Sequence, residues 1–153
     1  MIILTDQELM QVAIDEAIKG LKIGDQPFGS VIVINDEIVS IGRNKINSSF
    51  DITAHAEILA IKKASKEKKI IDFSEATIYA TWEPCPMCLG AIISANISKL
   101  VIAGRPEKHN KKYGNYSVEK FLELSNFSEK IEVVTGVLEN ESKSIVKKWT
   151  NKK

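Results

Sequence analysis

The sequence is poor in the residues that mark secreted, fibrous or membrane-embedded proteins. Its 153 residues include 2 cysteines, 4 prolines and 8 glycines. Two thiols are too few for a disulfide-stabilised scaffold, and the low proline and glycine contents exclude collagen-like and low-complexity chains. The longest apolar runs, such as 31–34 and 89–93, fall far short of the roughly 20 residues that span a bilayer. We therefore expect no membrane partner.

An excess of charge of one sign is also missing. Lysine and arginine together number 21 and the acidic residues 20, which gives a formal net charge of +1. A global positive field that would attract nucleic acid is therefore absent. Arginine, the usual residue for phosphate and base recognition, occurs only as Arg43 and Arg105. Lysine runs at 62–69, 108–112 and 147–153 are typical of solvated faces, with a polyanion contact as the alternative.

The chain start, Met1 to Glu8, has neither the basic region nor the small-residue cleavage site of a targeting peptide. This favours the cytoplasm, where two cysteines three positions apart indicate metal or redox chemistry. The length, with 44% hydrophobic and 27% charged residues, fits a single domain over 1–153. A domain of this size buries about 70% of the surface that its unfolded chain exposes, which is enough for a core.

The apolar pattern predicts an α/β fold with a layered sheet, because strands alternate with helices after a first hairpin. Strands are expected at 30–34, 38–41, 76–82, 100–103 and 131–135. Helices are expected from Thr5 to about Lys19, from Thr53 onward, and at 87–95, 118–124 and 138–149. The segments 44–52 and 104–117 are polar and are predicted to be loops.

Three side chains from two separate motifs have the types and spacing of a zinc site. His55 opens a predicted helix, whereas Cys85 and Cys88 lie at positions i and i+3 in the first turn of another. Both sulfurs can then point to one side of that helix. Two thiolates and one imidazole suit Zn²⁺, and three protein ligands leave the fourth tetrahedral position for water, as in catalytic sites.

Glu57 follows His55 by two residues and is close enough to take a proton from such a water, whose pKa a zinc ion lowers to about 7. Each signal alone has an ordinary explanation. A Cys-x-x-Cys pair is also typical of redox or buried pairs, and Glu57 alone is typical of an exposed helix residue. Their combination, with a strand–turn–helix context around the cysteines, favours a catalytic zinc centre.

The motif from His55 to Glu57, followed by the motif from Pro84 to Cys88, resembles the cytidine deaminase superfamily. Further matches lie at Pro27-Phe28-Gly29, Gly42-Arg43-Asn44 and Thr53-Ala54, so the resemblance covers nearly the whole chain. It implies a three-layer α/β/α fold with a five-stranded mixed sheet, commonly assembled as a homodimer. It also implies that His55, Cys85 and Cys88 hold one zinc ion and that Glu57 moves protons during hydrolytic deamination.

Three residues are candidates for binding the base. The amide of Asn44 offers a donor and an acceptor to the edge of a ring, and the rings of Phe28 and Trp82 suit its face. The alternatives are a turn role for Asn44 and core packing for Phe28. Trp82 is better placed, because it comes just before the Glu83-Pro84-Cys85 segment.

The substrate is less constrained than the chemistry. The segments 85–92 and 27–29 look most like those of guanine deaminases, so a free nucleobase of the guanine or cytosine type, in salvage or catabolism, is the main expectation. A tRNA-specific adenosine deaminase is the alternative, although 105–116 departs from the small-residue stretch of that type. Glu107 is a candidate substrate contact, and Trp149 is a candidate aromatic residue of the pocket. A non-catalytic zinc-binding relative is a remote third hypothesis, which the intact Glu57 disfavours.

Overall fold

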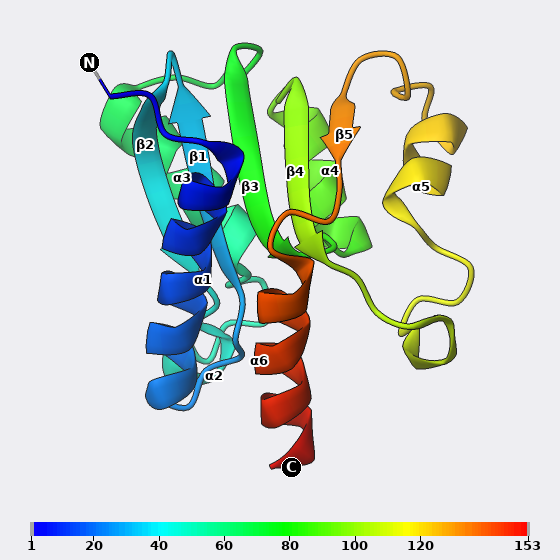
Figure 1. The fold of residues 1–153 in the computed structure, drawn as a ribbon. Coiled ribbons are helices and arrows are strands. Elements are labelled where there is room, and N and C mark those ends of the chain that lie inside the picture. The colour runs from blue at the N-terminus through cyan, green and yellow to red at the C-terminus, as the bar shows by residue number, and fades with distance from the viewer. Residues whose placement is uncertain (1, 153) are drawn as a thin grey trace.

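The computed structural model describes residues 2–152 as helices packed on both faces of one five-stranded sheet (Figure 1). The strand order is β2-β1-β3-β4-β5. The strands are β1 (Gly29–Ile34), β2 (Glu37–Arg43), β3 (Ala76–Trp82), β4 (Lys99–Gly104) and β5 (Glu132–Val134). The helices are α1 (Asp6–Lys22), α2 (Ile46–Ser49), α3 (Ala56–Lys68), α4 (Pro86–Ser94), α5 (Val118–Leu124) and α6 (Glu139–Asn151), with a 3₁₀ turn η1 (Lys108–Asn110).

The sheet is mixed, and this directs several chain segments to one edge. Strand β1 pairs antiparallel with both β2 and β3, whereas β3–β4 and β4–β5 are parallel. The ends of β2, β3 and β4 therefore lie beside the start of β1. Trp82 at the end of β3 is paired with Gly104 at the end of β4, and Gly29 is paired with Arg43. This edge carries the site described below.

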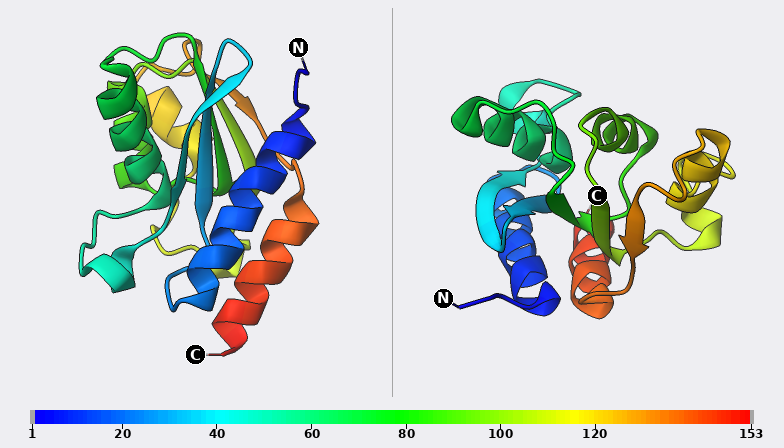
Figure 2. Two further views of the ribbon diagram at one scale, coloured as in Figure 1. Left: turned by 90° about the vertical axis from the view of Figure 1, so that its left-hand side faces the viewer. Right: turned by 90° about the horizontal axis from the view of Figure 1, so that it is seen from above.

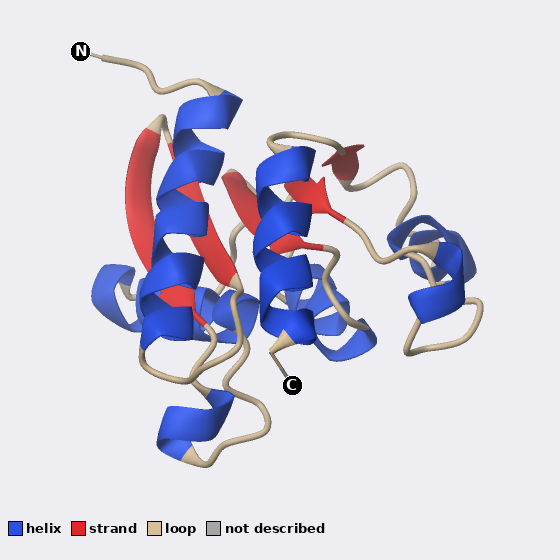
Figure 3. Ribbon diagram, turned by 60° about the horizontal axis from the view of Figure 1, so that its bottom comes forward, coloured by secondary structure: helices blue, strands red, loops and turns tan. Residues whose placement is uncertain are grey.

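Two apolar clusters hold the three layers together. Helices α1 and α6 lie side by side on one face of the sheet, and α3 and α4 cover the other (Figures 2 and 3). On the α1 face, Met10 and Ile14 pack with Val31 and Val101. On the α3 and α4 face, a larger cluster includes the buried Ile92 and residues from β3, β4 and α5. The predicted three-layer α/β/α architecture is confirmed.

Helix α1 begins where the sequence indicates. The Glu8 N–H donates to Thr5 Oγ1 at 3.2 Å, and the Thr5 N–H donates to Glu8 Oε2 at 2.9 Å, which completes a capping box. The helix continues to Lys22, one turn beyond the predicted end, and the chain then turns at Gly24, whose φ of +93° favours glycine.

The differences from the predicted elements are local. Helix α3 begins at Ala56 rather than at Thr53, because the Thr53 N–H and hydroxyl both donate to Asp51 Oδ1 and form a turn. Helix α2 and turn η1 lie inside segments predicted to be loops. Within residues 2–152, no helix has the length and apolarity needed to cross a membrane.

Candidate active site

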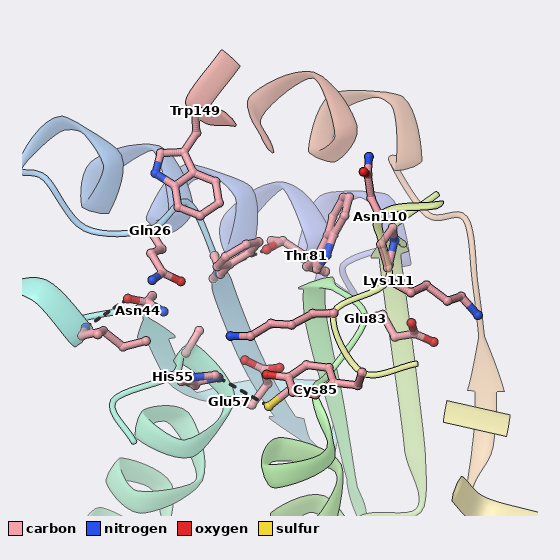
Figure 4. A pocket seen from close by; sticks show the side chains of 18 of the residues that line it. Gln26, Asn44, His55, Glu57, Thr81, Glu83, Cys85, Asn110, Lys111 and Trp149 are labelled. Carbon is pink, nitrogen blue, oxygen red and sulfur yellow. Dashed lines mark hydrogen bonds between the residues drawn. The ribbon is translucent and has the colours of Figure 1, made fainter. Parts of the chain in front are cut away.

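The site lies in a cavity of about 370 Å³ at the edge where β1 begins and β2 and β3 end. Its walls come from segments far apart in the sequence. They are the approach to β1 (Gln26 to Gly29), the loop after β2, the starts of α3 and α4, the 106–116 loop and α6. In Figure 4, His55, Glu57 and Cys85 lie together, and Trp149 lies on the far side of Gln26 and Asn44 from them.

The three expected metal ligands meet at this cavity, where His55 and Cys85 line the wall and Cys88 is buried beside them. His55 Nδ1 lies 3.6 Å from Cys85 Sγ and 3.4 Å from Cys88 Sγ, and all three ligand atoms lie within 4.8 Å of one another. A tetrahedral zinc ion with ordinary bond lengths separates a ligand nitrogen from a ligand sulfur by about 3.5 Å. The spacing and the donor set therefore fit Zn²⁺, and one zinc ion is assigned to the chain.

The starts of two helices hold these ligands in place. His55 and Cys85 are the residues that precede α3 and α4, and their carbonyls accept the first helical bonds, from Leu59 at 3.0 Å and Leu89 at 2.8 Å. Cys85 Sγ also accepts from the Cys88 N–H at 3.5 Å, and Pro86 occupies the first helical position. The helix N-terminus favours thiolates at this point.

The ligands influence one another's protonation. Hydrogen bonds from Cys88 and His55 lower the pKa of Cys85 to about 4, even though burial acts in the opposite direction. The hydrogen bond to Cys85 raises the pKa of Cys88, and burial adds to this effect. The pKa of His55 is raised by its hydrogen bond with Cys85. The cluster thus holds a thiolate, which is the form of cysteine that binds a metal cation.

Glu57 is the buried carboxyl group of the site. Its residue is 8% exposed, and it lies in the first turn of α3 at the cavity wall. Burial raises its pKa to about 7. A carboxyl group with a pKa near neutrality can both accept and release a proton at physiological pH.

Three aromatic rings form another part of the cavity wall. The ring centroids of Phe28 and Trp82 lie 6.3 Å apart, and those of Phe28 and Trp149 lie 5.8 Å apart in an edge-to-face arrangement. The ring of Trp82 can lie close against the paired strand because the facing residue is Gly104, which has no side chain. A Cβ at Gly104 would fall 2.6 Å from Trp82 Cζ3. All three rings line the cavity.

Asn44 is 1% exposed and lines the cavity between the metal ligands and the aromatic wall. Its Oδ1 accepts from the Ile46 N–H at 3.0 Å. The oxygen is therefore used in a local turn, which was the alternative considered for this residue. The amide nitrogen remains as the donor, so the amide has less to offer a base than the donor–acceptor pair that the sequence predicts.

The segment 105–117 is bonded to neighbouring parts of the structure at both of its ends. Arg105 Nη2 lies 2.9 Å from Glu83 Oε2 and 2.5 Å from Glu119 Oε1, and Glu83 also accepts from the Val118 N–H at 3.2 Å. The Tyr116 hydroxyl donates to the Pro84 carbonyl, directly before Cys85. These bonds fasten the segment to the turn that carries the metal ligands.

Sequence reasoning missed some of the lining residues. Lys111, Lys112 and Tyr113 line the cavity, and the charge of Lys112 acts on His55 against the rise in its pKa. The lysine run at 108–112 was the available signal, but no local pattern indicates which side chains face inward. Glu107 is not a cavity residue. It is exposed and pairs with Lys143 at 3.6 Å.

Comparison with known proteins agrees with this geometry. Residues 4–104 match the family described as the cytidine and deoxycytidylate deaminase zinc-binding region. The chain is also 37% identical to the tRNA-specific adenosine deaminase of Bacillus subtilis over 136 residues. These residues cover 89% of this chain and 83% of that protein. The chain belongs to the cytidine deaminase superfamily. It is a deaminase that cleaves a C–N bond hydrolytically.

Within the superfamily, tRNA adenosine deaminases and guanine deaminases are both among the proteins that resemble the chain. The guanine deaminase of Bacillus subtilis is 41% identical over 87 residues, or 56% of each chain. A structure from a study of A-to-I editing by tRNA:A34 deaminases at the wobble position has a TM-score of 0.80 and 30% identity, covering 90% of this chain and 97% of that one. A guanine deaminase from Nitrosomonas europaea has a TM-score of 0.83 at 20% identity, covering 99% and 87%, which shows the shared fold alone.

Proposed function

We propose that this deaminase converts adenosine to inosine at the wobble position of a tRNA. The observation that carries the proposal is the extent of the similarity. The tRNA-specific relative from Bacillus subtilis matches 89% of the chain, whereas the guanine deaminase of the same organism matches 56%. This reverses the order in which the sequence motifs ranked the two substrates, and it favours the alternative over the free base.

The charge of the cavity supports an RNA substrate. Lys111 and Lys112 line it, and a nucleotide within RNA carries phosphates, whereas a free nucleobase carries none. The carboxyl groups among the described lining residues are those of Glu57 and Glu83, and Glu83 is held by Arg105. A free guanine would present N–H donors for which the pocket has no further carboxylate.

In the proposed reaction, adenosine and water give inosine and ammonia. His55, Cys85 and Cys88 hold the zinc ion, which when bound lowers the pKa of a water molecule to about 7. Glu57 accepts one proton of the attacking water at a carboxylate oxygen and delivers it to the ring nitrogen beside the reacting carbon. It then takes the second proton of the same water and passes it to the amine, which departs as ammonia. The pKa of about 7 that burial gives Glu57 suits both directions of transfer.

The three candidate base-binding residues hold the adenine ring. The Asn44 amide nitrogen donates to an acceptor on the ring edge, and Phe28 and Trp82 pack against the ring face. Trp149 joins this aromatic wall from α6 through its edge-to-face contact with Phe28. We include the homodimer in the proposal, with a mass in solution of twice 17.0 kDa as its check.

The test uses zinc-replete protein and a tRNA transcript with adenosine at position 34. Inosine is read as guanosine after reverse transcription, so conversion at position 34 alone is the expected result. Glu57→Gln is the matched control, because it preserves the side-chain size and removes the titratable group. Turnover of guanine or cytosine with an unchanged transcript would overturn the proposal and support the second candidate, a free-base deaminase, which the 41% identity to guanine deaminase favours.

A further inference from the structure

A second, basic groove lies at the outer edge of the sheet, beside β2. It is a cavity of about 600 Å³ bordered by α1, β2 and α3. Five of its ten lining residues are cations and two are carboxylates. The whole chain has a net charge of only +1, so positive charge is concentrated here well above the average of the molecule. The five cations are Arg43, Lys45, Lys62, Lys63 and Lys66.

One face of α3 supplies most of this charge. Leu59, Lys62, Lys63 and Lys66 follow the i, i+3, i+4, i+7 spacing of a single helical face. The face that α3 buries against the sheet is a different one, which includes Ala60 and Ala64. The lysines are therefore directed away from the core, and the three are exposed.

Arg43 forms the inner side of the groove. Its side chain passes over Gly20, where a Cβ would come within 3.6 Å of Arg43 Cδ, and its Nη1 lies 3.6 Å from Glu16 Oε2. The other oxygen of Glu16 bonds to Lys19 at 3.1 Å, so one carboxylate is shared between two cations. The buried Nε of Arg43 has no hydrogen-bond partner among the described residues. That atom is closed to solvent, but the Arg43 side chain as a whole is 27% exposed, so part of it remains open to the groove.

The groove adjoins the active site through the backbone. Arg43 ends β2 and lines the groove, Asn44 lines the active-site cavity, and Lys45 lines the groove again. On α3, Lys62 and Lys66 lie five and nine residues beyond Glu57. That places them about 8 and 14 Å from it along the helix axis. A strand with one nucleotide in the active site can thus continue across Lys45 toward the lysine face.

We propose that this groove binds the phosphate backbone of the RNA substrate outside the nucleotide that reacts. The proposal rests on the proposed function for the choice of RNA. A protein partner fits less well, because lysine is depleted in protein–protein interfaces and the groove offers only Ile41 and Leu59 as larger apolar groups. Contacts of this kind fix the position of the RNA and carry no sequence information.

The experiment measures RNA binding by fluorescence anisotropy as a function of salt. The probes are two labelled tRNA transcripts that differ only in adenosine or guanosine at position 34. Lys62→Gln, Lys63→Gln and Lys66→Gln are combined in one variant. Each lost phosphate contact removes about 0.7 to 0.9 from the slope of log K against log salt. We expect the slope to fall by about two and the affinity at 100 mM salt to drop at least ten-fold for both transcripts.

A matched control removes three lysines at the opposite edge of the sheet. Lys99→Gln, Lys120→Gln and Lys130→Gln lower the net charge equally, around β4, α5 and β5. This variant should bind within two-fold of the wild type. A gain-of-function variant works in the other direction: Glu67→Gln removes an exposed carboxylate from the groove and should tighten binding two- to five-fold.

The outcomes separate the groove from the proposed function. Loss of binding to both transcripts in the groove variant alone supports the groove, even if the wild type forms no inosine and the proposed function fails. Equal losses of RNA affinity in the groove variant and the control variant overturn the groove proposal, because total charge would then explain the binding. The groove proposal is also overturned if the groove variant binds RNA normally but has a changed mass by light scattering. The lysine face of α3 would then be an interface between copies of the chain. Failure of the wild type to bind either transcript overturns the groove proposal as well.

Discussion

Gly104→Ala should lower deaminase activity without removing the metal ligands. The new Cβ would lie 2.6 Å from Trp82 Cζ3 and 2.8 Å from Trp82 Cε3, and 3.1 Å from Ser142 Oγ. Ordinary carbon contacts begin at about 3.5 Å, so the ring of Trp82 must move by about 1 Å. A shift of this size in a group that positions the substrate reduces the rate up to about 100-fold. Forcing extra volume into a packed region costs about 1–3 kcal/mol of stability.

The assay is the initial rate of deamination at several substrate concentrations, together with zinc content and thermal unfolding. Gly90→Ala in α4 is the matched control, because a Cβ at this position would have no neighbouring atom within 4 Å and alanine favours a helix by about 1 kcal/mol. That variant should keep full activity and unfold at the same or a higher temperature. Wild-type kcat/KM in Gly104→Ala would show that the position of Trp82 is unimportant for the substrate and would refute the reasoning.

Three further changes test other parts of the structure. Cys88→Ser should lose the bound zinc and all turnover, as measured by metal analysis after gel filtration, and retention of one zinc per chain would contradict the ligand assignment. Arg105→Gln should remove the ion-pair partner of the buried Glu83 side chain and lower the free energy of unfolding by about 1–3 kcal/mol at neutral pH. Although burial acts to raise the pKa of Glu119, hydrogen bonds from Arg105 hold it below its usual range. The Arg105 pair therefore stabilises the fold above that usual pKa, and the stabilisation disappears as the pH falls through the lowered value. The difference between wild type and Arg105→Gln in urea unfolding should narrow in acid, and a constant difference would argue against the pair. Thr5→Ala removes the capping box of α1 and should cost about 1 kcal/mol in urea unfolding, with unchanged activity; an unchanged midpoint would contradict that role.

The metal site could be predicted because its information is local. Cys85 and Cys88 are three residues apart at the start of one helix, so their spacing aligns the two sulfurs. His55 stands at the start of another helix, and its association with the cysteines was predicted from the combination of the two motifs. The position of Glu57 in the first turn of α3 was predictable for a similar reason, because this residue follows His55 by two positions. The five strands were also predictable, because each is a short β-branched or apolar run bounded by polar residues.

The substrate pocket could not be predicted in the same way, because it depends on tertiary contacts. The rings of Trp149 and Phe28 belong to residues that are far apart in the sequence. They come into contact because α6 packs beside α1. Lys112 faces the cavity because Arg105 and Tyr116 fasten its segment on both sides. The role of Asn44 was narrowed by a hydrogen bond to its own backbone neighbour, Ile46. Motifs shared by guanine and tRNA adenosine deaminases ranked the two substrates in the opposite order to the similarity of the whole chain.

The measurement that tests the central claim most directly compares two specificity constants. Zinc-replete wild type would be given an anticodon stem-loop with adenosine at position 34 and, separately, free guanine, with Glu57→Gln as the blank for each. We expect a kcat/KM for the RNA at least 100-fold above that for guanine, and turnover of neither by Glu57→Gln. A larger kcat/KM for guanine, or full activity in Glu57→Gln, would contradict it.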